Sequence, residues 1–200
     1  LKNIQRLGVN PYPAKSSRKH TLEIARKMMG KKVVVGGRIR SLRPHGKITF
    51  ADLEDASGKI QLFFSEQELP GEKYEFLTNF DIGDFIESSG EIFKTQAGEI
   101  TVRVSDYKLL TKSLRPIPPS FYGLKDTETR LRKRYVDLIA NPQVKDIFLK
   151  KAKFWAAVRN FLTENGFTEV ETPALELVPG GADATPFLTH HNALDMDVYL

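Results

Sequence analysis

Between residues 32 and 110, apolar and polar positions alternate with the two-residue period that is typical of β-strands. The alternation defines five runs, at residues 33–39, 48–53, 60–64, 85–93 and 100–110. Turn signals separate several of them, at residues 44–46, 55–58 and 96–98. A helical stretch at residues 72–80 follows the third run, and five strands with a helix inserted there is the element order of an OB-fold. The pattern predicts a small β-barrel and leaves the choice between the OB-fold and other barrels open.

The clearest helix pattern covers residues 142–165. Asn141 is suited to cap its start, Pro142 takes the first helical position and Gly166 ends it. Apolar residues recur along two neighbouring lines, Val144, Phe148, Ala152, Trp155, Val158 and Leu162 on one and Ile147, Phe154 and Phe161 on the other. A face this wide fits packing on its own domain alone, or on that domain and a partner together. Residues 168–173 are predicted to form a short strand closed by proline.

These patterns divide the chain into four segments. Residues 1–30 form a helical lead-in, residues 31–111 the barrel, residues 112–141 a linker and residues 142–200 the beginning of a second domain. Thr21 can cap a helix of the lead-in that runs through Met29 and is stopped by Gly30. The linker carries four cations at positions 130–134, which either form a solvated face or contact nucleic-acid phosphates. The expected fold class is α+β.

Composition narrows the function classes. Lys and Arg number 30 against 25 Asp and Glu, and a net charge of +5 is compatible with a polyanionic partner without indicating one by itself. The chain has no cysteine, which excludes disulfides and thiolate metal sites. No apolar run reaches the ~18 residues of a membrane span. The chain begins at Leu1 rather than Met and ends at Leu200 without a tail, so we expect a piece of a longer protein.

Four side chains of the predicted barrel are candidates for contact with an unpaired base, because OB-folds bind single strands through aromatic platforms and basic grooves. If Ala51 faces the core, Phe50 faces outward, where its ring can stack on a base. Gln61 also points outward and offers a donor and an acceptor, Arg43 precedes the first turn, and Glu99 opens the last strand. Each residue alone fits an ordinary role, a core ring or a solvated side chain. Their placement on adjacent strands favours binding.

Two C-terminal motifs are candidate ligand or metal sites. Residues 179–182 read Pro-Gly-Gly-Ala, which makes either a tight turn or a close approach to a ligand. His190, His191, Asp195 and Asp197 suggest a metal site, but adjacent histidines point in different directions, which favours structural hydrogen bonding instead. The sequence shows no phosphate-cradling loop, catalytic triad or dinucleotide fingerprint.

Several stretches resemble the class II lysyl-tRNA synthetase family, and the resemblance covers essentially the whole chain. They are GKITFADL at 46–53, LTKSLRP at 110–116, RYVDLI at 134–139, GFTEVETP at 166–173, PGGA at 179–182 and HHNALDMD at 190–197. The stretch at 166–173 is shared with the aspartyl and asparaginyl relatives. The last two stretches are of the lysine type, and they favour this family over those relatives.

The resemblance implies an enzyme that uses ATP and Mg²⁺ to attach L-lysine to tRNA(Lys) through lysyl-adenylate. Its OB-fold domain reads the anticodon, with Phe50 stacked on the central uracil, Arg43 and Gln61 hydrogen bonded to that base, and Glu99 near another anticodon base. Gly181 matches a position that lines the lysine pocket.

The resemblance also implies a homodimer through residues 142–173, which are similar to the first class II signature motif, and a cytoplasmic location. The ATP-binding and metal-binding residues of the family lie in later motifs. No catalytic residue or metal site is therefore expected here, and the segment alone is expected to be inactive. Thr185 stands where the family commonly has arginine, which removes a cation near the pocket. The alternative is a non-catalytic OB-fold RNA-binding protein or a synthetase-like paralogue.

Overall fold

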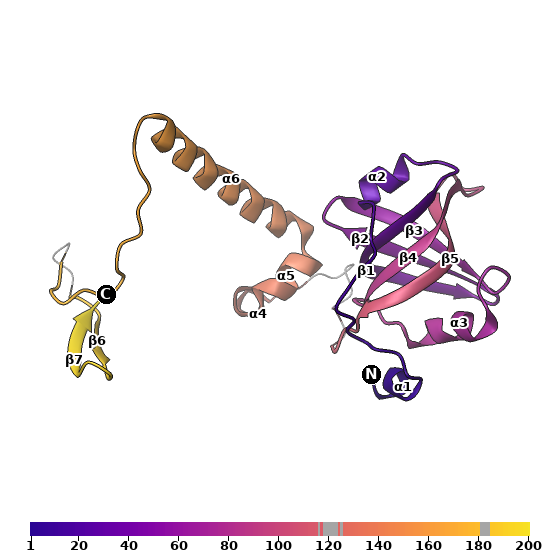
Figure 1. Ribbon diagram of the computed structural model, residues 1–200, viewed down its shortest axis with the longest axis horizontal. Coiled ribbons are helices and arrows are strands. Elements are labelled where there is room, and N and C mark those ends of the chain that lie inside the picture. Colours follow the sequence, from indigo (N-terminus) through magenta and orange to yellow (C-terminus); the bar gives the residue numbers. More distant parts are fainter. Residues whose placement is uncertain (116, 118–123, 125, 181–184) are drawn as a thin grey trace. The chain divides into compact units, whose positions relative to one another are not determined.

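The computed structural model describes residues 1–115, 117, 124, 126–180 and 185–200 (Figure 1). Contacts along the chain divide it into two units, Leu1–Ala140 and Asn141–Leu200. Each unit is described by itself.

Unit 1 is built around a closed five-stranded barrel. Its strands are β1 (Lys32–His45), β2 (Ile48–Asp55), β3 (Gly58–Ser65), β4 (Phe85–Lys94) and β5 (Ile100–Thr111). They close in the order β1-β2-β3-β5-β4, with β3 and β5 parallel and the other neighbouring strands antiparallel. A closed barrel of five strands with a helix after the third confirms the predicted OB-fold.

The alternating side chains fill the barrel as the sequence pattern predicts. On β2, Ala51 and Leu53 are fully buried, whereas Phe50, which directly precedes Ala51, is only partly buried. On β3, Ile60 and Leu62 are buried on either side of Gln61. Because successive side chains of a strand point to opposite faces, Phe50 and Gln61 lie on the outer face of the barrel. The core is completed mainly by aliphatic side chains of β1, β4 and β5.

Two glycines allow neighbouring strands of the barrel to approach each other closely, Gly37 on β1 towards β2 and Gly90 on β4 towards β5. A Cβ atom on Gly37 would lie 2.5 Å from the backbone carbonyl oxygen of Glu54. A Cβ atom on Gly90 would overlap the backbone carbonyl of Arg103. The β4–β5 register shifts between Ser89 and Gly90, so Gly90 lies at a β-bulge, where glycine commonly marks such an approach.

Helices α1 (Lys2–Arg6) and α2 (Leu22–Arg26) form the lead-in. Thr21 caps α2 as predicted, with its Oγ1 accepting a hydrogen bond from the backbone N–H of Ile24 at 3.3 Å. The helix ends at Arg26, before the predicted end at Met29. Gly30 (φ +70°) follows beyond it, and its N–H donates to the Ile92 carbonyl of β4. Helix α3 (Gly71–Phe76) and the 3-10 turn η1 (Leu77–Asn79) confirm the predicted helix after the third strand. In Figure 1, α2 and α3 lie at opposite ends of the barrel.

The first predicted turn is displaced by two residues. Pro44 and His45, which were expected to form it, belong to β1 and pair with Thr49 and Ile48 of β2. The turn itself consists of Gly46 and Lys47. Gly46 has φ +60°, a conformation that glycine adopts without steric cost, so the reversal occurs there rather than at the proline. The turns at 55–58 and 96–98 are confirmed.

Helices α4 (Thr127–Arg132) and α5 (Arg134–Ala140) occupy the segment expected to be a linker, and the sequence analysis predicted neither. Asp137 is fully buried and accepts hydrogen bonds from Arg130 Nε at 2.9 Å and Arg134 Nη1 at 2.5 Å. Arg132 pairs with Glu128 at 2.8 Å. Three of the four cations at positions 130–134 are therefore held by carboxylates of this helical pair, a role that neither interpretation of the run included.

A buried ion pair fixes the chain where it leaves β5. The Lys112 ammonium lies 2.8 Å from Asp84, which is fully buried, and 2.5 Å from Asp81. Asp84 also accepts a hydrogen bond from the backbone N–H of Ser113 at 2.7 Å. Burial lowers the pKa of Lys112, but the hydrogen bonds and charges of the two aspartates outweigh it and raise that pKa overall.

Unit 2 contains helix α6 (Pro142–Glu164) and a two-stranded antiparallel sheet of β6 (Leu188–His191) and β7 (Met196–Tyr199). Helix α6 begins after Asn141 with Pro142 in its first turn, and Gly166 has φ +85° just beyond its end, as predicted, but the Asn141 side chain makes no capping hydrogen bond to the helix. The prediction of a strand at 168–173 is wrong for this chain, since these residues belong to no strand in the described ranges. A strand requires hydrogen bonding to a neighbouring strand, and the β-pairing near this segment among the described residues is a single bridge between Glu176 and Tyr199.

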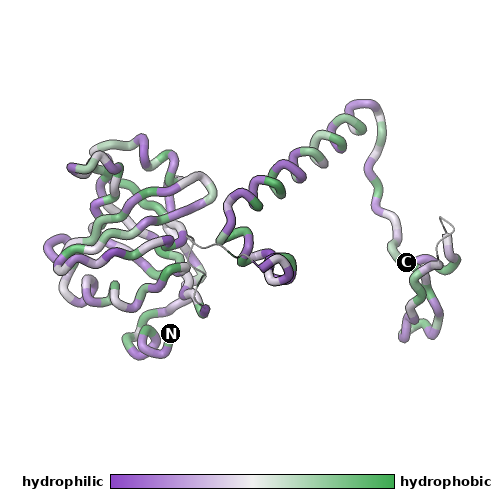
Figure 2. The backbone as a smooth tube through the Cα atoms, turned by 180° about the vertical axis from the view of Figure 1, so that it is seen from behind, coloured by the Kyte–Doolittle hydropathy of each residue, from purple (hydrophilic) through white to green (hydrophobic). Residues whose placement is uncertain are grey.

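Apolar side chains of α6 are widely exposed. Every residue of the helix is at least partly accessible, and Ile147, Phe154 and Phe161 are each more than 60% exposed. Figure 2 shows apolar segments recurring along α6 between hydrophilic ones. Within the described residues, no helix combines the length and apolar character needed to cross a membrane.

Candidate nucleic-acid interface

Three of the predicted base-binding residues lie together on the outer face of β1, β2 and β3. Arg43 and Phe50 are direct cross-strand partners in the β1–β2 ladder. Gln61 of β3 lies opposite Asp52 of β2, and Asp52 is the next outward-facing residue after Phe50 on β2. All of these side chains are partly buried. The structure therefore brings a ring, a cation and an amide to one patch.

The guanidinium of Arg43 is held by the carboxylate of Asp52. Nη1 lies 2.6 Å from Oδ2 and Nη2 lies 3.0 Å from Oδ1, which makes a two-pronged pair. Arg43 Nη1 also lies 2.5 Å from Ser41 Oγ. The hydrogen bond from Arg43 is the main reason that the pKa of Asp52 lies below its usual value, and the same bond raises the pKa of Arg43. The pair orients the guanidinium while leaving some of its five N–H groups for a ligand.

Gln61 and Glu99 are linked through Thr101 of β5. The Thr101 hydroxyl lies 2.9 Å from Gln61 Oε1 and 3.3 Å from the backbone oxygen of Glu99. Glu99 was expected to open the last strand, but β5 begins at Ile100 and Glu99 lies immediately before it. Its backbone exchanges hydrogen bonds with Thr95, with the Thr95 N–H donating to the Glu99 oxygen at 2.9 Å and the Glu99 N–H donating to Thr95 Oγ1 at 3.0 Å. The exposed Glu99 side chain thus projects from a closed turn.

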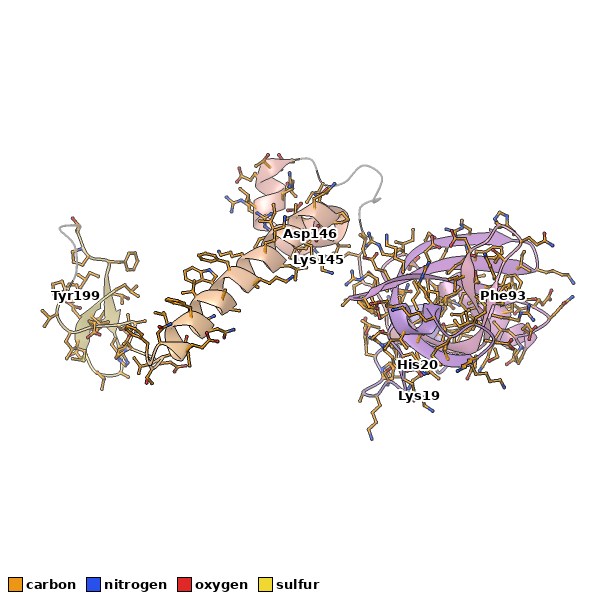
Figure 3. All side chains as sticks on the ribbon, turned by 90° about the horizontal axis from the view of Figure 1, so that it is seen from above. Lys19, His20, Phe93, Lys145, Asp146 and Tyr199 are labelled. Carbon is orange, nitrogen blue, oxygen red and sulfur yellow. The ribbon has the colours of Figure 1, made fainter. Side chains whose placement is uncertain are left out.

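Further aromatic and cationic side chains extend this face, and the sequence analysis missed them. Phe63 of β3 lies 5.3 Å from Phe50, and Phe93 of β4 lies 6.0 Å from Phe63, measured between ring centroids. The guanidinium carbon of Arg103 on β5 is 4.8 Å from the centre of the Phe93 ring. Phe93 is labelled on the barrel in Figure 3. Together with Phe50 these residues line an open groove of about 610 Å³.

The missed residues carry the same signal that placed Gln61. Phe63 lies between Leu62 and Phe64, and Arg103 lies between two buried valines, so strand alternation alone assigns both side chains to the outer face. Alternation does not show which outward residues of different strands lie side by side. That depends on the register, in which Phe63 pairs with Phe50 on one side and with Arg103 on the other.

Of the two C-terminal candidate sites, the structure describes the histidines and aspartates at 190–197 but not Gly181. Gly181, expected to line a lysine pocket, lies outside the described residues. His190 Nδ1 lies 2.9 Å from Asp197 Oδ1, and its Nε2 lies 3.5 Å from Asp195 Oδ1, so the favoured interpretation of structural hydrogen bonding is confirmed. Among the described residues, no three His, Cys, Asp or Glu side chains are grouped so that they could hold a metal ion.

Comparison with known proteins identifies both parts of the chain. Residues 33–110 match the family model for an OB-fold nucleic acid binding domain, and residues 126–200 match that for class II tRNA synthetases (D, K and N). The chain is 47% identical over its full length to a lysine–tRNA ligase of Syntrophomonas wolfei, and 48% identical to one of Pelotomaculum thermopropionicum. Another from Thermoanaerobacter sp. (strain X514) is 53% identical over 86% of this chain.

The chain spans only part of these relatives. It covers 41% of the Syntrophomonas protein, 40% of the Pelotomaculum protein and 34% of the Thermoanaerobacter protein. The two family models match adjoining regions in the order OB-fold, then synthetase. The similarity to each lysine–tRNA ligase runs through both regions, so the chain belongs to the class II lysyl-tRNA synthetase family and contains an OB-fold nucleic acid binding domain followed by a region of the synthetase domain.

Proposed function

We propose that this chain binds the anticodon loop of tRNA(Lys) as part of an enzyme that attaches L-lysine to that tRNA. The observation that carries the proposal is the patch on the barrel where Arg43, Phe50 and Gln61 meet on neighbouring strands. Relatives named lysine–tRNA ligase that are 47–48% identical over the whole chain support the choice of lysine.

The patch has the chemistry needed to hold one unpaired uracil. The outward ring of Phe50 can stack on the base, a contact worth roughly 1–3 kcal/mol. Uracil has two carbonyl acceptors and one N–H donor, which match the donors of Arg43 and the amide of Gln61. Asp52 acts as a positioning residue, because it fixes the Arg43 guanidinium before the base arrives. Glu99, at the edge of the same face, is proposed to lie near a second anticodon base.

We propose that the complete enzyme, rather than this segment alone, activates lysine. There ATP and Mg²⁺ would supply the adenylate, and the protein would act by positioning and charge stabilisation. Among the described residues, no group of three or more His, Cys, Asp or Glu side chains could hold a metal ion. We propose that Gly181 contributes to the lysine pocket.

We further propose that the enzyme is a cytoplasmic homodimer that associates through residues 142–173. Helix α6 supports this interface, because Ile147, Phe154 and Phe161 expose apolar surface along one side of it. Exposed apolar patches rimmed by charged residues commonly mark protein interaction sites.

The test is binding of this chain to an anticodon stem-loop carrying UUU, compared with the same loop in which the central U is changed. Fluorescence anisotropy should show tighter binding to the UUU loop. Equal binding of the two loops would contradict anticodon reading and favour a non-catalytic OB-fold RNA-binding protein. For the complete enzyme, exchange of pyrophosphate into ATP should depend on lysine, and a preference for aspartate or asparagine would refute the amino-acid assignment.

A further inference from the structure

We propose that Arg40 is a positioning residue for transfer of lysine to tRNA. It ties the end of α5 to the strand that carries Arg43, so that an RNA held by the barrel is presented correctly to the synthetase domain. The inference rests on the proposed function, because it assumes that the barrel holds an anticodon and that the complete enzyme charges the same tRNA. Arg40 lies outside the candidate base-binding patch, and its contacts are with Glu54 and the backbone of α5.

Arg40 is the extra residue of a β-bulge on β1. Ile39 and Ser41 pair with adjacent residues of β2, so no residue of β2 lies opposite Arg40. A bulge turns the extra side chain out of the regular alternation of the strand. The Arg40 side chain is only 13% exposed, and its Nη2 donates a hydrogen bond to the backbone oxygen of Ile139 at 3.1 Å. The bulge thus aims a guanidinium at a residue 99 positions away in the chain.

The acceptor of this hydrogen bond lies in the last turn of α5. Backbone oxygens in the last turn of a helix have no partner within the helix, and a cation at this end is favourable. Ala140, which ends α5, is buried, and only Asn141 separates it from the start of α6 at Pro142. Arg40 therefore holds the chain immediately before it enters the first long helix of the region that matches class II synthetases.

Glu54 holds the guanidinium from the other side. Its Oε2 lies 3.0 Å from Arg40 Nε and 3.6 Å from Lys59 Nζ. No described residue donates a hydrogen bond to this oxygen, so its pair with Arg40 is an ionic contact. The planar fork of arginine can face a carboxylate with one nitrogen and a carbonyl with another. Glu54 therefore orients Arg40 while the aligned hydrogen bond is made to Ile139.

The same stretch of β1 is joined to the beginning of the segment between β5 and α6, and to the base-binding patch. The N–H of Ile39 donates to the Asp84 carbonyl at 2.8 Å, and the Asp84 carboxylate lies 2.8 Å from Lys112, where the chain leaves β5. On the other side of the bulge, Ser41 Oγ lies 2.5 Å from Arg43 Nη1. A base held at Arg43 and the residues that lead into α6 are therefore fixed to one short piece of strand.

The test compares three activities of the complete enzyme carrying Arg40→Met, a substitution that keeps an apolar stem and removes the donors. Exchange of pyrophosphate into ATP should be unchanged, because it needs lysine and ATP but no tRNA. Binding of the UUU stem-loop should be unchanged, because the patch is intact. The kcat for charging tRNA should fall by about 10-fold or more, since a misplacement of about 1 Å can cost about 100-fold.

Two further variants make the result specific. Arg26 of α2 also donates to a backbone oxygen, that of Lys59 at 2.9 Å, so Arg26→Met is a matched control that should leave all three activities unchanged. Arg40→Lys keeps the charge beside Glu54, but a single ammonium cannot replace both nitrogens of the fork. It should show the same pattern with a smaller loss of charging. Urea unfolding reports the fold of each variant, and Arg40→Lys decides the matter if Arg40→Met does not fold.

The outcomes separate this proposal from the proposed function. Absence of lysine-dependent exchange, or equal binding of the two stem-loops, in the unsubstituted enzyme refutes the proposed function. Where both activities are present, normal charging by the folded Arg40 variants overturns the positioning role. A parallel loss of stem-loop binding or of exchange also overturns it, because Arg40 would then act on the patch or on the fold. An equal loss of charging in Arg26→Met overturns it as well.

Discussion

Replacing Phe50 by alanine should weaken RNA binding while leaving the barrel folded. Phe50 lies on the outer face of β2, where its ring centroid is 5.3 Å from that of Phe63. Phe64, on the neighbouring strand, points the other way and is fully buried in the core. The two phenylalanines therefore provide a matched pair of substitutions that differ in the face of the barrel they affect.

The expected magnitudes differ by assay. Loss of the Phe50–Phe63 contact should lower the free energy of unfolding by about 0.5–1.5 kcal/mol, the range for an aromatic pair. Loss of a base stack should weaken RNA binding by roughly 1–3 kcal/mol, or about 5- to 150-fold in Kd. Phe64→Ala should instead lower the free energy of unfolding by about 3–5 kcal/mol, because it leaves a cavity in a packed core.

Urea unfolding and anisotropy titration of the same protein samples give both quantities. Phe50→Ala should retain a cooperative unfolding transition near that of the unsubstituted chain and bind the UUU stem-loop more weakly. A loss of stability as large as that of Phe64→Ala would show that Phe50 belongs to the core. Unchanged RNA binding by a folded Phe50→Ala protein would refute the stacking role.

Three further perturbations test other parts of the structure. Asp52→Asn should lower the free energy of unfolding at neutral pH by only about 0.5–1 kcal/mol, because Arg43 and Asp52 are 40% and 34% exposed. Since Arg43 lowers the pKa of Asp52, this contribution is present above the unfolded pKa of about 3.9 and is lost as pH falls through the lower folded value. The difference between the two proteins in urea unfolding should therefore shrink in acid, and a constant difference would contradict the assignment. Lys112→Met should cost about 3–5 kcal/mol in urea unfolding, because it leaves the carboxylate of Asp84 buried without its cation, and a loss below 1 kcal/mol would contradict that role. In the full-length enzyme, Phe161→Asp should convert a dimer to a monomer by light scattering, and a monomer before substitution would refute the proposed interface.

Local periodicity accounted for most of the barrel. Buried Ala51 and Ile60 define the facing of Phe50 and Gln61, and this follows from strand geometry without knowledge of the neighbours. The reversal at Gly46 rather than Pro44 was less accessible, because a proline is tolerated at certain positions of a strand and the positive φ is visible only in the structure. Element type is thus easier to predict than element boundary.

Features that depend on distant partners could not be predicted. Asp137 reads as a polar residue in a charged stretch, yet it is buried because Arg130 and Arg134 satisfy it. The helical pair α4–α5 was missed for the same reason, since its interior is an ion cluster rather than an apolar stripe. Likewise, the position of Phe63 between Phe50 and Arg103 follows from the strand register, which no single segment encodes.

Because Gly90 on β4 approaches the backbone of Arg103 on β5 so closely, the tolerance of this face to mutation depends on a position inside the sheet. Gly90 itself presents no side chain to RNA, but a methyl group there would displace the carbonyl of the residue that bears the exposed guanidinium. Substitutions at position 90 should therefore resemble lesions of the binding surface even though they arise inside the sheet. A survey of sequence variation that scored only solvent-facing positions would overlook this site.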